Sequence, residues 1–355
     1  MVRRIALGCL CARLRWGLTC WLALFVFAGV AQAAPLLRVL AWPGYADADV
    51  VAQFEQRHGV RVEVTTVSSD EALRSQMANA QPAFDVVAAN TVEIARLVAA
   101  KKLEPLNVQA IPNLAHQLPR FRPLSVIAGI TDAERVYAVP YTWSEMGLIY
   151  DRTQWAAPPD SWAVLWDPKW RGRVLEFDSA DHGFSLAALH RGLPPFQIPP
   201  DQMRSLALDL VEFRRNLLAF YNLPEEAVRL FRAHKVALLF ANYGQQQLKL
   251  LRDAGMDVGY VIPREGALAW LDCWAVPAGA REPLLAHQWI NDMLEPSVSH
   301  TLTLRQGLAN TLEPAPGLDA GAASPKILWL EPLEDEAQRS RLWRRIVSGE
   351  RAERF

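Results

Sequence analysis

Cysteine is scarce in this chain of 355 residues, and its placement excludes a disulfide framework. Three of the four cysteines, Cys9, Cys11 and Cys20, lie in the N-terminal segment, which leaves Cys273 alone in the rest of the chain. The seven histidines form no H-E-x-x-H motif and no close pair, and no phosphate-binding loop is present. The sequence therefore predicts no metal site and no cofactor.

An excess of charge is also missing, since 37 basic residues face 38 acidic ones. The N-terminal segment holds four of the arginines and no acidic residue. Without that segment the net charge is near −5, with 33 basic residues against 38 acidic ones. This mild acidity argues against nucleic acid as a partner.

Residues 1–33 have the order of regions that is typical of a secretory signal peptide. Four arginines precede an apolar run over 18–30, which ends in the small-residue site Ala31-Gln32-Ala33. We expect cleavage after Ala33. An uncleaved membrane anchor is the alternative, and the shortness of the apolar run disfavours it.

Strand and helix patterns alternate after this segment. Strand patterns over 37–41, 61–67 and 84–89 are each followed by a helical pattern, the second over 72–80 and the third over 91–101. This alternation predicts a parallel sheet with helices on both faces and ligand sites at the carboxyl ends of its strands. Trp42, Tyr45, Asn90 and Thr91 lie in the corresponding loops.

A second α/β region follows two strand-like segments at 136–143 and 147–150. It is predicted from a strand over 174–177, a buried strand over 236–240, and helices around 161–166 and over 184–189, 201–220, 224–234 and 245–254. A helix over 283–294, an Ala/Pro/Gly-rich linker over 309–323 and a charged helix over 334–349 complete the chain. The predicted fold is α/β with two lobes, each a sheet flanked by helices, joined by two crossing segments. The predicted limits are 34–141 and 265–313 for the first lobe, 142–264 for the second lobe and 314–355 for the C-terminal linker and helix.

The segment 260–277 reads as a strand, a bend and a returning strand. In the returning strand, Trp270 and Asp272 share one face, and Leu271 and Cys273 share the other. An aromatic ring beside a carboxylate suits an amine-bearing ligand, because both attract a positive charge. The structural alternative is a core tryptophan next to a capping aspartate.

Five sequence elements, in this order and spacing, resemble the bacterial periplasmic substrate-binding proteins of the spermidine/putrescine ABC-transporter group. They are L-A-W-P-G-Y at 40–45, Y-A-V-P-Y-T-W at 137–143, S-W-A-V-L-W-D-P at 161–168 with Arg171-Gly172, V-I-P-R-E-G-A at 261–267, and the segment 286–296. The resemblance extends to about Asn310. It implies a two-lobed type II fold that closes on its ligand by a hinge motion. It also implies a periplasmic, monomeric and non-enzymatic protein that delivers a small amine to an ABC permease of the inner membrane.

The resemblance also implies a set of ligand contacts. The positions that match the family are Trp42, Tyr45, Asn90, Trp143, Trp270 and Asp272. Three positions depart from it, since Val92, Ala241 and Leu308 stand where the family often has aromatic residues. The sequence therefore predicts a ligand pocket with less ring area than is common in the family.

The family's acidic D-x-x-E element can be aligned in two ways. An ungapped match places Ser179 and His182 on the acidic positions, and a shift by one residue places Asp178 and Asp181 there. With Ser179 and His182, Asp272 would be the single carboxylate facing the ligand. A di- or trication would then be under-compensated by several kcal/mol per buried charge, and a monoamine or zwitterion would fit better. Both alignments stay open at this point.

Other functions are supported less well by the sequence. Ser185 follows a strand and opens a helix, but the second glycine of a nucleophile elbow is absent, so a hydrolase is not expected. Iron-binding relatives of this fold use adjacent tyrosines, whereas Tyr137 and Tyr141 are four residues apart. A receptor for another organic solute, or a periplasmic sensor without a transport role, remains an alternative. The ligand, its charge and affinity, and the partner permease are left open.

Overall fold

The computed structural model describes residues 34–78, 83–314 and 326–355, and residues 36–355 form a unit of their own. The predicted signal peptide therefore lies outside the described residues, as do the end of the predicted helix over 72–80 and much of the linker predicted over 309–323. Among the described helices, none combines the length and the apolar character that are needed to cross a membrane.

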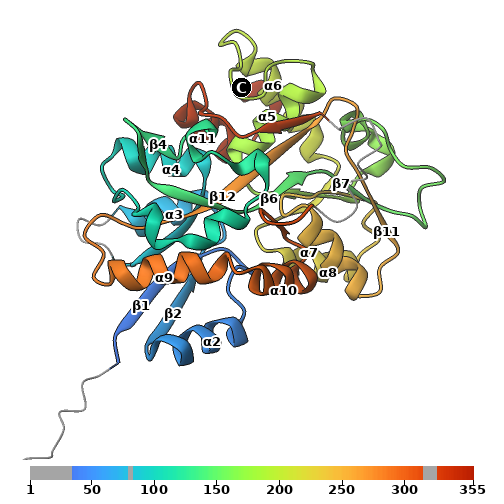
Figure 1. Cartoon of the computed structure of the whole chain (residues 1–355). Coiled ribbons are helices and arrows are strands. Elements are labelled where there is room, and N and C mark those ends of the chain that lie inside the picture. The colour runs from blue at the N-terminus through green and yellow to red at the C-terminus, as the bar shows by residue number, and fades with distance from the viewer. Residues whose placement is uncertain (1–33, 79–82, 315–325) are drawn as a thin grey trace, which may run out of the picture. The chain divides into compact units, whose positions relative to one another are not determined.

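The first sheet has seven strands. Figure 1 labels four of them, β1, β2, β6 and β12. They are β1 (Leu36–Ala41), β2 (Arg61–Thr66), β3 (Val86–Asn90), β6 (Ala138–Met146), β12 (Ala267–Ala275), β13 (Ala309–Asn310) and β14 (Ile327–Trp329). Their order is β13-β6-β12-β3-β1-β2, and β14 pairs with β12. Strand β1 is parallel to β2 and β3, as predicted, but β12 is antiparallel to both β3 and β6. The sheet is therefore mixed rather than parallel, because β12, β13 and β14 run against the first three strands, whereas the crossing strand β6 runs in the same direction as these three.

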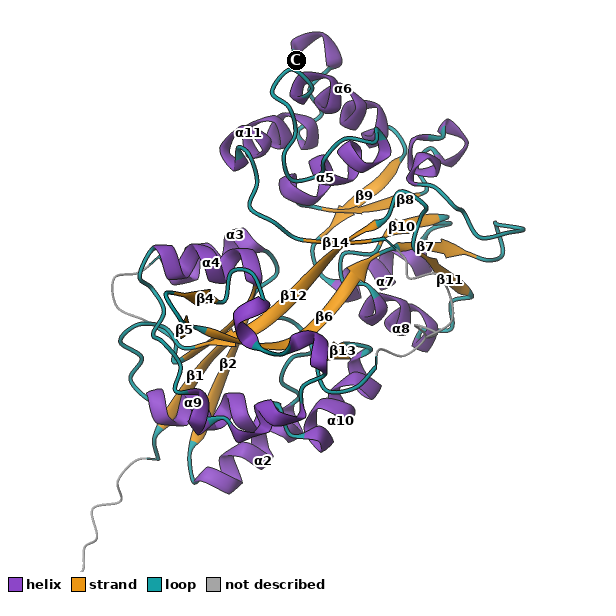
Figure 2. Ribbon diagram, turned by 45° about the horizontal axis from the view of Figure 1, so that its top comes forward, coloured by secondary structure: helices purple, strands orange, loops and turns teal. Residues whose placement is uncertain are grey.

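Helices cover both faces of this sheet, as the sequence predicts (Figure 2). One face packs on α2 (Ala48–His58), α9 (Pro283–Met293) and α10 (Pro296–Gln306), and the other on α3 (Asp70–Met77) and α4 (Thr91–Ala99). Alternate residues of β1 belong to different cores. Val39 packs on the face covered by α2, α9 and α10, and Leu40 packs on the face covered by α3 and α4. Helix α10 has no counterpart among the predicted elements, because polar side chains occupy most of its length.

The second sheet has five strands in the order β11-β7-β10-β8-β9. They are β7 (Leu148–Asp151), β8 (Val174–Phe177), β9 (Leu217–Tyr221), β10 (Leu238–Phe240) and β11 (Val258–Val261). The helices α5 (Ala180–His190), α6 (Met203–Arg214), α7 (Pro224–Ala233) and α8 (Gln245–Asp253) contribute to the core of this lobe. The segment around 161–166 is a short 3-10 helix over Trp162–Trp166.

The predicted helix over 201–220 is wrong in its second part. Helix α6 ends at Arg214, and strand β9 follows it and pairs in parallel with β8. Asn216 fixes the turn between them, because its Nδ2 donates to two main-chain carbonyls of the segment before β8, at 2.9 and 3.0 Å. These bonds and the strand pairing override the helical tendency of the leucine and alanine residues in this stretch.

Two crossings connect the sheets. Strand β6 of the first sheet leads directly into β7 of the second, and β11 leads back into β12. At the first crossing Gly147 donates its N–H to Tyr260 Oη at 2.9 Å, and a Cβ at this position would lie 2.4 Å from Tyr260 Cζ. The change of sheet falls near the predicted limits of the second lobe, 142–264, whose boundaries stay a prediction.

The C-terminal segment contacts both lobes. Strand β14, which the sequence does not predict, pairs with Ala267–Ala269 of β12, whereas α11 (Glu336–Val347) packs against α5 and α6. Arg339 of α11 has no exposed surface and donates to the carbonyls of Asp181 and Pro195 and to Ser185 Oγ at 2.8 to 3.1 Å. The predicted terminal helix is thus confirmed, and it is fixed to the second lobe by a buried guanidinium.

Candidate functional site

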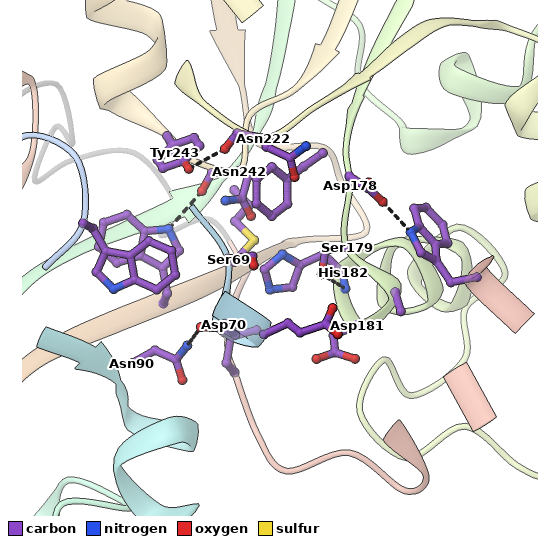
Figure 3. Close-up of a pocket in the computed structure, with 18 of the residues that line it drawn as sticks. Ser69, Asp70, Asn90, Asp178, Ser179, Asp181, His182, Asn222, Asn242 and Tyr243 are labelled. Carbon is purple, nitrogen blue, oxygen red and sulfur yellow. Dashed lines mark hydrogen bonds between the residues drawn. The ribbon is translucent and has the colours of Figure 1, made fainter. Parts of the chain in front are cut away.

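A cavity of about 470 Å³ lies between the lobes, which is a typical size for a small-molecule site. Nine of the ten predicted contacts line it, namely Trp42, Tyr45, Asn90, Asp178, Ser179, Asp181, His182, Trp270 and Asp272. Figure 3 shows that polar side chains of the first lobe, among them Asp70 and Asn90, face side chains of the second lobe across it. Segments far apart in the sequence therefore meet at one site.

Trp42 and Tyr45 reach the cavity from the loop after β1. The chain turns at Gly44, whose φ of +81° favours glycine, and a Cβ at this position would lie 2.6 Å from Gln246 Nε2. Tyr45 is buried, and its hydroxyl donates to Asp272 Oδ2 at 2.6 Å. This loop therefore places an aromatic ring and a hydrogen-bond donor against the carboxylate of the returning strand.

Trp270 and Asp272 lie on the same face of β12, as their spacing predicts, and both line the cavity. Trp270 Nε1 donates to the Asn242 carbonyl at 3.0 Å, which fixes the indole where the lobes meet. Burial raises the pKa of the Asp272 carboxyl to about 7, although the hydrogen bond from Tyr45 lowers it in part. Among the described residues, no basic side chain forms an ion pair with Asp272 to offset this burial.

A second carboxylate, that of Asp70, lines the cavity and is absent from the predicted contacts. The sequence around it predicts only a helix cap, and Ser69 does cap α3. Asp70 Oδ1 accepts from Asn90 Nδ2 at 3.0 Å, while Asn90 Oδ1 caps α4. Burial raises the pKa of Asp70 well above its usual value, and the charge of Glu93 adds to this effect while Arg74 opposes it. A residue of the first turn of α3, next to the capping Ser69, thus places a second carboxyl group in the cavity.

Arg74 is a basic side chain at the same wall, but acidic residues already surround it. Its Nη1 donates to Glu93 Oε1 at 2.7 Å. Burial acts to lower the pKa of Arg74, and the charges of Glu93, Asp70 and Asp181 raise it. The guanidinium is therefore compensated by protein carboxylates and makes a poor site for an anionic ligand.

The two alignments of the acidic element both bring their residues to the cavity wall. Ser179 caps α5, because its hydroxyl oxygen accepts from the His182 main-chain N–H at 3.3 Å. Burial lowers the pKa of His182 to about 4, so the ring is neutral at ordinary pH. Burial, reinforced by Glu336, raises the pKa of Asp181 to about 6. The negative charge of this element comes from Asp178 and Asp181.

Trp143 is the predicted contact that the structure places elsewhere. It pairs with Leu271 across β6 and β12, whereas Trp270 pairs with Ser144, so the period of two turns Trp143 away from the cavity. Its ring is 2% exposed and lies 5.9 Å from that of Trp329. Trp143 therefore does not line this cavity, and the sequence motif does not show on which face of the crossing strand the ring lies.

We expect Trp143→Phe to lower the free energy of unfolding by about 1 kcal/mol, because the smaller ring leaves part of its packing unfilled. Affinity for an amine ligand should stay within about twofold, since the side chain lies on the other face of the sheet. Chemical denaturation and calorimetric titration of the same sample would measure both effects. A tenfold loss of affinity in a folded variant would place Trp143 in the site after all.

Side chains of α11 form a further wall that sequence reasoning missed. They are Ser340, Trp343, Arg344 and Val347, together with Ser348, the C-cap of the helix. Their spacing of three and four residues places them on one face of a helix. The abundance of charged residues around them predicts only a solvated helix, although the apolar pair Trp343 and Val347 is a signal of a buried face.

The three departures from the family pattern do not leave the cavity without rings. Ala241 and Leu308 are buried, and Val92 lies beside a smaller neighbouring cavity. Phe177 and Tyr243, from the second lobe, line the main cavity together with the predicted aromatic residues. Aromatic area that is absent at the family positions is therefore partly supplied by other residues.

The geometry around Ser185 does not favour a hydrolase. Ser185 Oγ donates to the Pro195 carbonyl at 2.8 Å and accepts from Arg339 at 2.9 Å, so a buried arginine occupies the place of a general base.

Cys273 is buried and free. Within the described ranges, no group of three or more His, Cys, Asp or Glu side chains is arranged to hold a metal ion.

Comparison with known proteins agrees with this architecture. The model of the bacterial extracellular solute-binding protein family matches residues 49–326. The chain belongs to this family. A relative in Escherichia coli, the putrescine-binding periplasmic protein PotF, is 26% identical over 88% of this chain and 91% of its own length. The spermidine/putrescine-binding periplasmic protein 1 of Haemophilus influenzae is 23% identical, over 85% and 81% of the two chains.

Solved structures of solute-binding proteins share the two-lobed fold. The spermidine/putrescine ABC transporter substrate-binding protein PotD of Streptococcus pneumoniae superimposes with a TM-score of 0.70 at 21% identity, over 89% of this chain and 99% of its own. The PotD lipoprotein of Treponema pallidum gives a TM-score of 0.68 at 18% identity, over 88% and 98% of the two chains. This solute-binding protein therefore has the predicted two-lobed α/β fold.

Proposed function

We propose that this protein is the periplasmic receptor of an ABC importer and that it binds a polyamine or another small amine-bearing solute between its lobes. The observation that carries the proposal is the Asp272 carboxyl, which is buried beside Trp270, accepts a hydrogen bond from Tyr45 and has no cationic partner among the described side chains. A ligand ammonium would supply that missing charge. The names of the periplasmic relatives give independent support.

The remaining wall of the cavity supports more than one positive charge on the ligand. Asp70 and Asp181 also line the cavity and have raised pKa values, because burial disfavours their charged forms. Arg74 compensates one of these charges at most. A diamine would place its second ammonium near this pair, so the acidic alignment with Asp178 and Asp181 fits the proposal better than that with Ser179 and His182.

The contacts of an ammonium group with the aromatic rings contribute to the binding free energy about as much as its hydrogen bonds to the carboxylates. An ammonium enclosed between rings gains about 0.5 to 2 kcal/mol per ring, and a charge-assisted hydrogen bond gains about 1.5 to 3 kcal/mol. Micromolar affinity requires about 8 kcal/mol. Trp42, Tyr45 and Trp270 with two carboxylates reach this range.

Export and delivery complete the proposal. The signal peptide over 1–33 directs the chain to the periplasm and is cleaved after Ala33. The mature protein acts as a monomer, catalyses no reaction and presents its closed, ligand-bound form to a permease of the inner membrane. A sensory role without transport is the alternative, and loss of amine uptake in a deletion strain would distinguish a transport role from it.

Calorimetric titration of the mature protein against putrescine, spermidine, amino acids and betaine tests the ligand class. Binding of an amine with micromolar or tighter affinity is the expected result. Binding of amino acids alone would support a receptor for another organic solute. Absence of binding by every amine, in protein shown to be folded by circular dichroism, would reject the proposed ligand class.

A further inference from the structure

One face of the C-terminal helix α11 forms the wall of the cavity at the second lobe. The face is made by Ser340, Trp343, Arg344, Val347 and Ser348. The proposed amine site at Asp272 lies on β12, in the first sheet. Figure 3 shows Asn242 and Asp178 on opposite sides of the residues drawn. The Asn242 carbonyl accepts from Trp270 Nε1, and Asp178 accepts from Trp343 Nε1, so the two indoles mark different ends of the cavity.

Trp343 is held rigidly in this wall. Its Nε1 donates to Asp178 Oδ1 at 2.8 Å, and its ring lies edge to face with that of Phe220, with centroids 5.4 Å apart. The indole also covers Gly183, where a Cβ would come within 2.4 Å of Trp343 Cζ3. With 6% of its surface exposed, Trp343 has contacts on several sides and little freedom to move aside for a ligand.

The helix that carries Trp343 is itself fixed at its start. Arg339, one turn earlier, is fully buried and bonded to Ser185 and to the carbonyls of Asp181 and Pro195. Glu336, in the first turn, forms an ion pair with Arg96 of the first lobe. The contacts of Arg339 fix α11 to the second lobe, so the wall keeps its position relative to Asp178 and Asp181 of that lobe.

This wall carries a positive charge of its own, whereas the positive charge of Arg74 elsewhere in the cavity is compensated by carboxylates. Asp70, Asp181 and Asp272 attract ammonium groups, whereas Arg344 on the α11 face carries a positive charge. Arg344 is exposed, and in the described part of the chain no carboxylate forms an ion pair with it. A ligand that extends beyond Asp181 would therefore meet a fixed indole and a cation of the same sign as its own ammonium groups.

We propose that Trp343 and Arg344 limit the length and charge of the ligand, so that a short diamine binds better than a triamine. This inference rests on the proposed function and extends it, because it names the part of the amine class that the site selects. Trp343 acts by occupying space at the end of the cavity, and Arg344 acts by repelling a third ammonium.

Titration of putrescine and spermidine against the mature wild-type protein and three variants tests this proposal. We expect wild-type protein to bind putrescine at least about tenfold more tightly than spermidine. Arg344→Gln should improve the spermidine-to-putrescine affinity ratio by about threefold, and high salt should reduce this gain. Trp343→Leu, which keeps an apolar side chain, should improve the ratio by about tenfold by freeing space.

Arg341→Gln is the matched control, because it removes the same charge from an exposed position of α11 that does not line the cavity. It should leave the ratio unchanged.

An unchanged ratio in both Arg344→Gln and Trp343→Leu, or tighter binding of spermidine by the wild type, would overturn the inference while leaving the proposed function intact. Absence of binding of either amine by folded wild-type protein would reject the proposed function and this inference with it. Because Arg344 is exposed, Arg344→Gln should fold normally, and its affinity ratio tests the inference even if Trp343→Leu folds poorly.

Discussion

Asp272→Asn is expected to weaken amine binding by at least about 2 kcal/mol, or roughly thirtyfold or more in Kd. The substitution keeps the size of the side chain and removes the charge that would face the ligand ammonium. Thermal stability should not fall, because the wild-type carboxyl is buried without a cationic partner among the described residues. Calorimetric titration and a thermal melt on one sample would separate the two effects.

Tyr45→Phe serves as a graded control for this result. It removes the 2.6 Å hydrogen bond to Asp272 but keeps both the aromatic ring and the carboxylate. We expect a loss of about 1 kcal/mol in binding, which is smaller than the loss in Asp272→Asn. If Asp272→Asn binds amines as tightly as the wild type, Asp272 has only a structural role and the proposed charge recognition is wrong.

Amine affinity should fall steeply as the pH is lowered through neutrality. Burial raises the pKa of Asp272 to about 7 and that of Asp181 to about 6, so both carboxyl groups take up protons as the pH falls from about 8 to 5. The ligand ammonium keeps its charge over this range and must displace those protons. From Asp272 alone we expect binding to be about 100-fold weaker near pH 5 than near pH 8.

The stability of the ligand-free protein should respond in the opposite direction. The folded pKa of Asp272 lies above the unfolded one, so the carboxyl adds stability below the unfolded pKa, and this contribution is lost as the pH rises through about 7. The melting temperature of the wild type, measured relative to that of Asp272→Asn, should therefore be lower at pH 8 than at pH 5. Titrations in two buffers of different ionisation enthalpy would also detect proton release on binding. Affinity that does not change with pH would contradict this account.

Much of the fold could be predicted from the sequence because its signals are local. The period of two in β12 places Trp270 and Asp272 on one face, and the alternation of strands and helices before Lys101 indicates the first half of the first sheet. Strand β9 was missed because its leucine and alanine residues also suit a helix, and its state depends on contacts of Asn216 with a distant segment. Direct pairing with β8 decides the outcome.

The candidate site could be predicted less completely, since some of its residues have two roles. Asp70 has the sequence environment of a helix cap, and its place in the cavity depends on the bond from Asn90, twenty residues away. Trp343 lies 165 residues from Asp178, to which it is bonded. Trp143 lies away from the cavity although its motif matches the family, because a motif around a ring does not determine which face of a strand the ring occupies. The positions of these residues depend on strand register and on contacts between distant segments, which the local sequence pattern does not contain.

The position of Asp272 has a consequence for the order of events during ligand capture. Its carboxylate and Tyr45 both belong to the first sheet and its loops, and their hydrogen bond does not involve the second lobe. Asp178 and Asp181 lie on the second lobe, so they approach or leave this site when the lobes move. In the proposed function, one ammonium group would therefore bind before closure, and the second lobe would then add its charges to a ligand that is already oriented. Asp272 would then govern whether an amine is retained at first contact, and Asp178 and Asp181 would govern how long the closed receptor holds it.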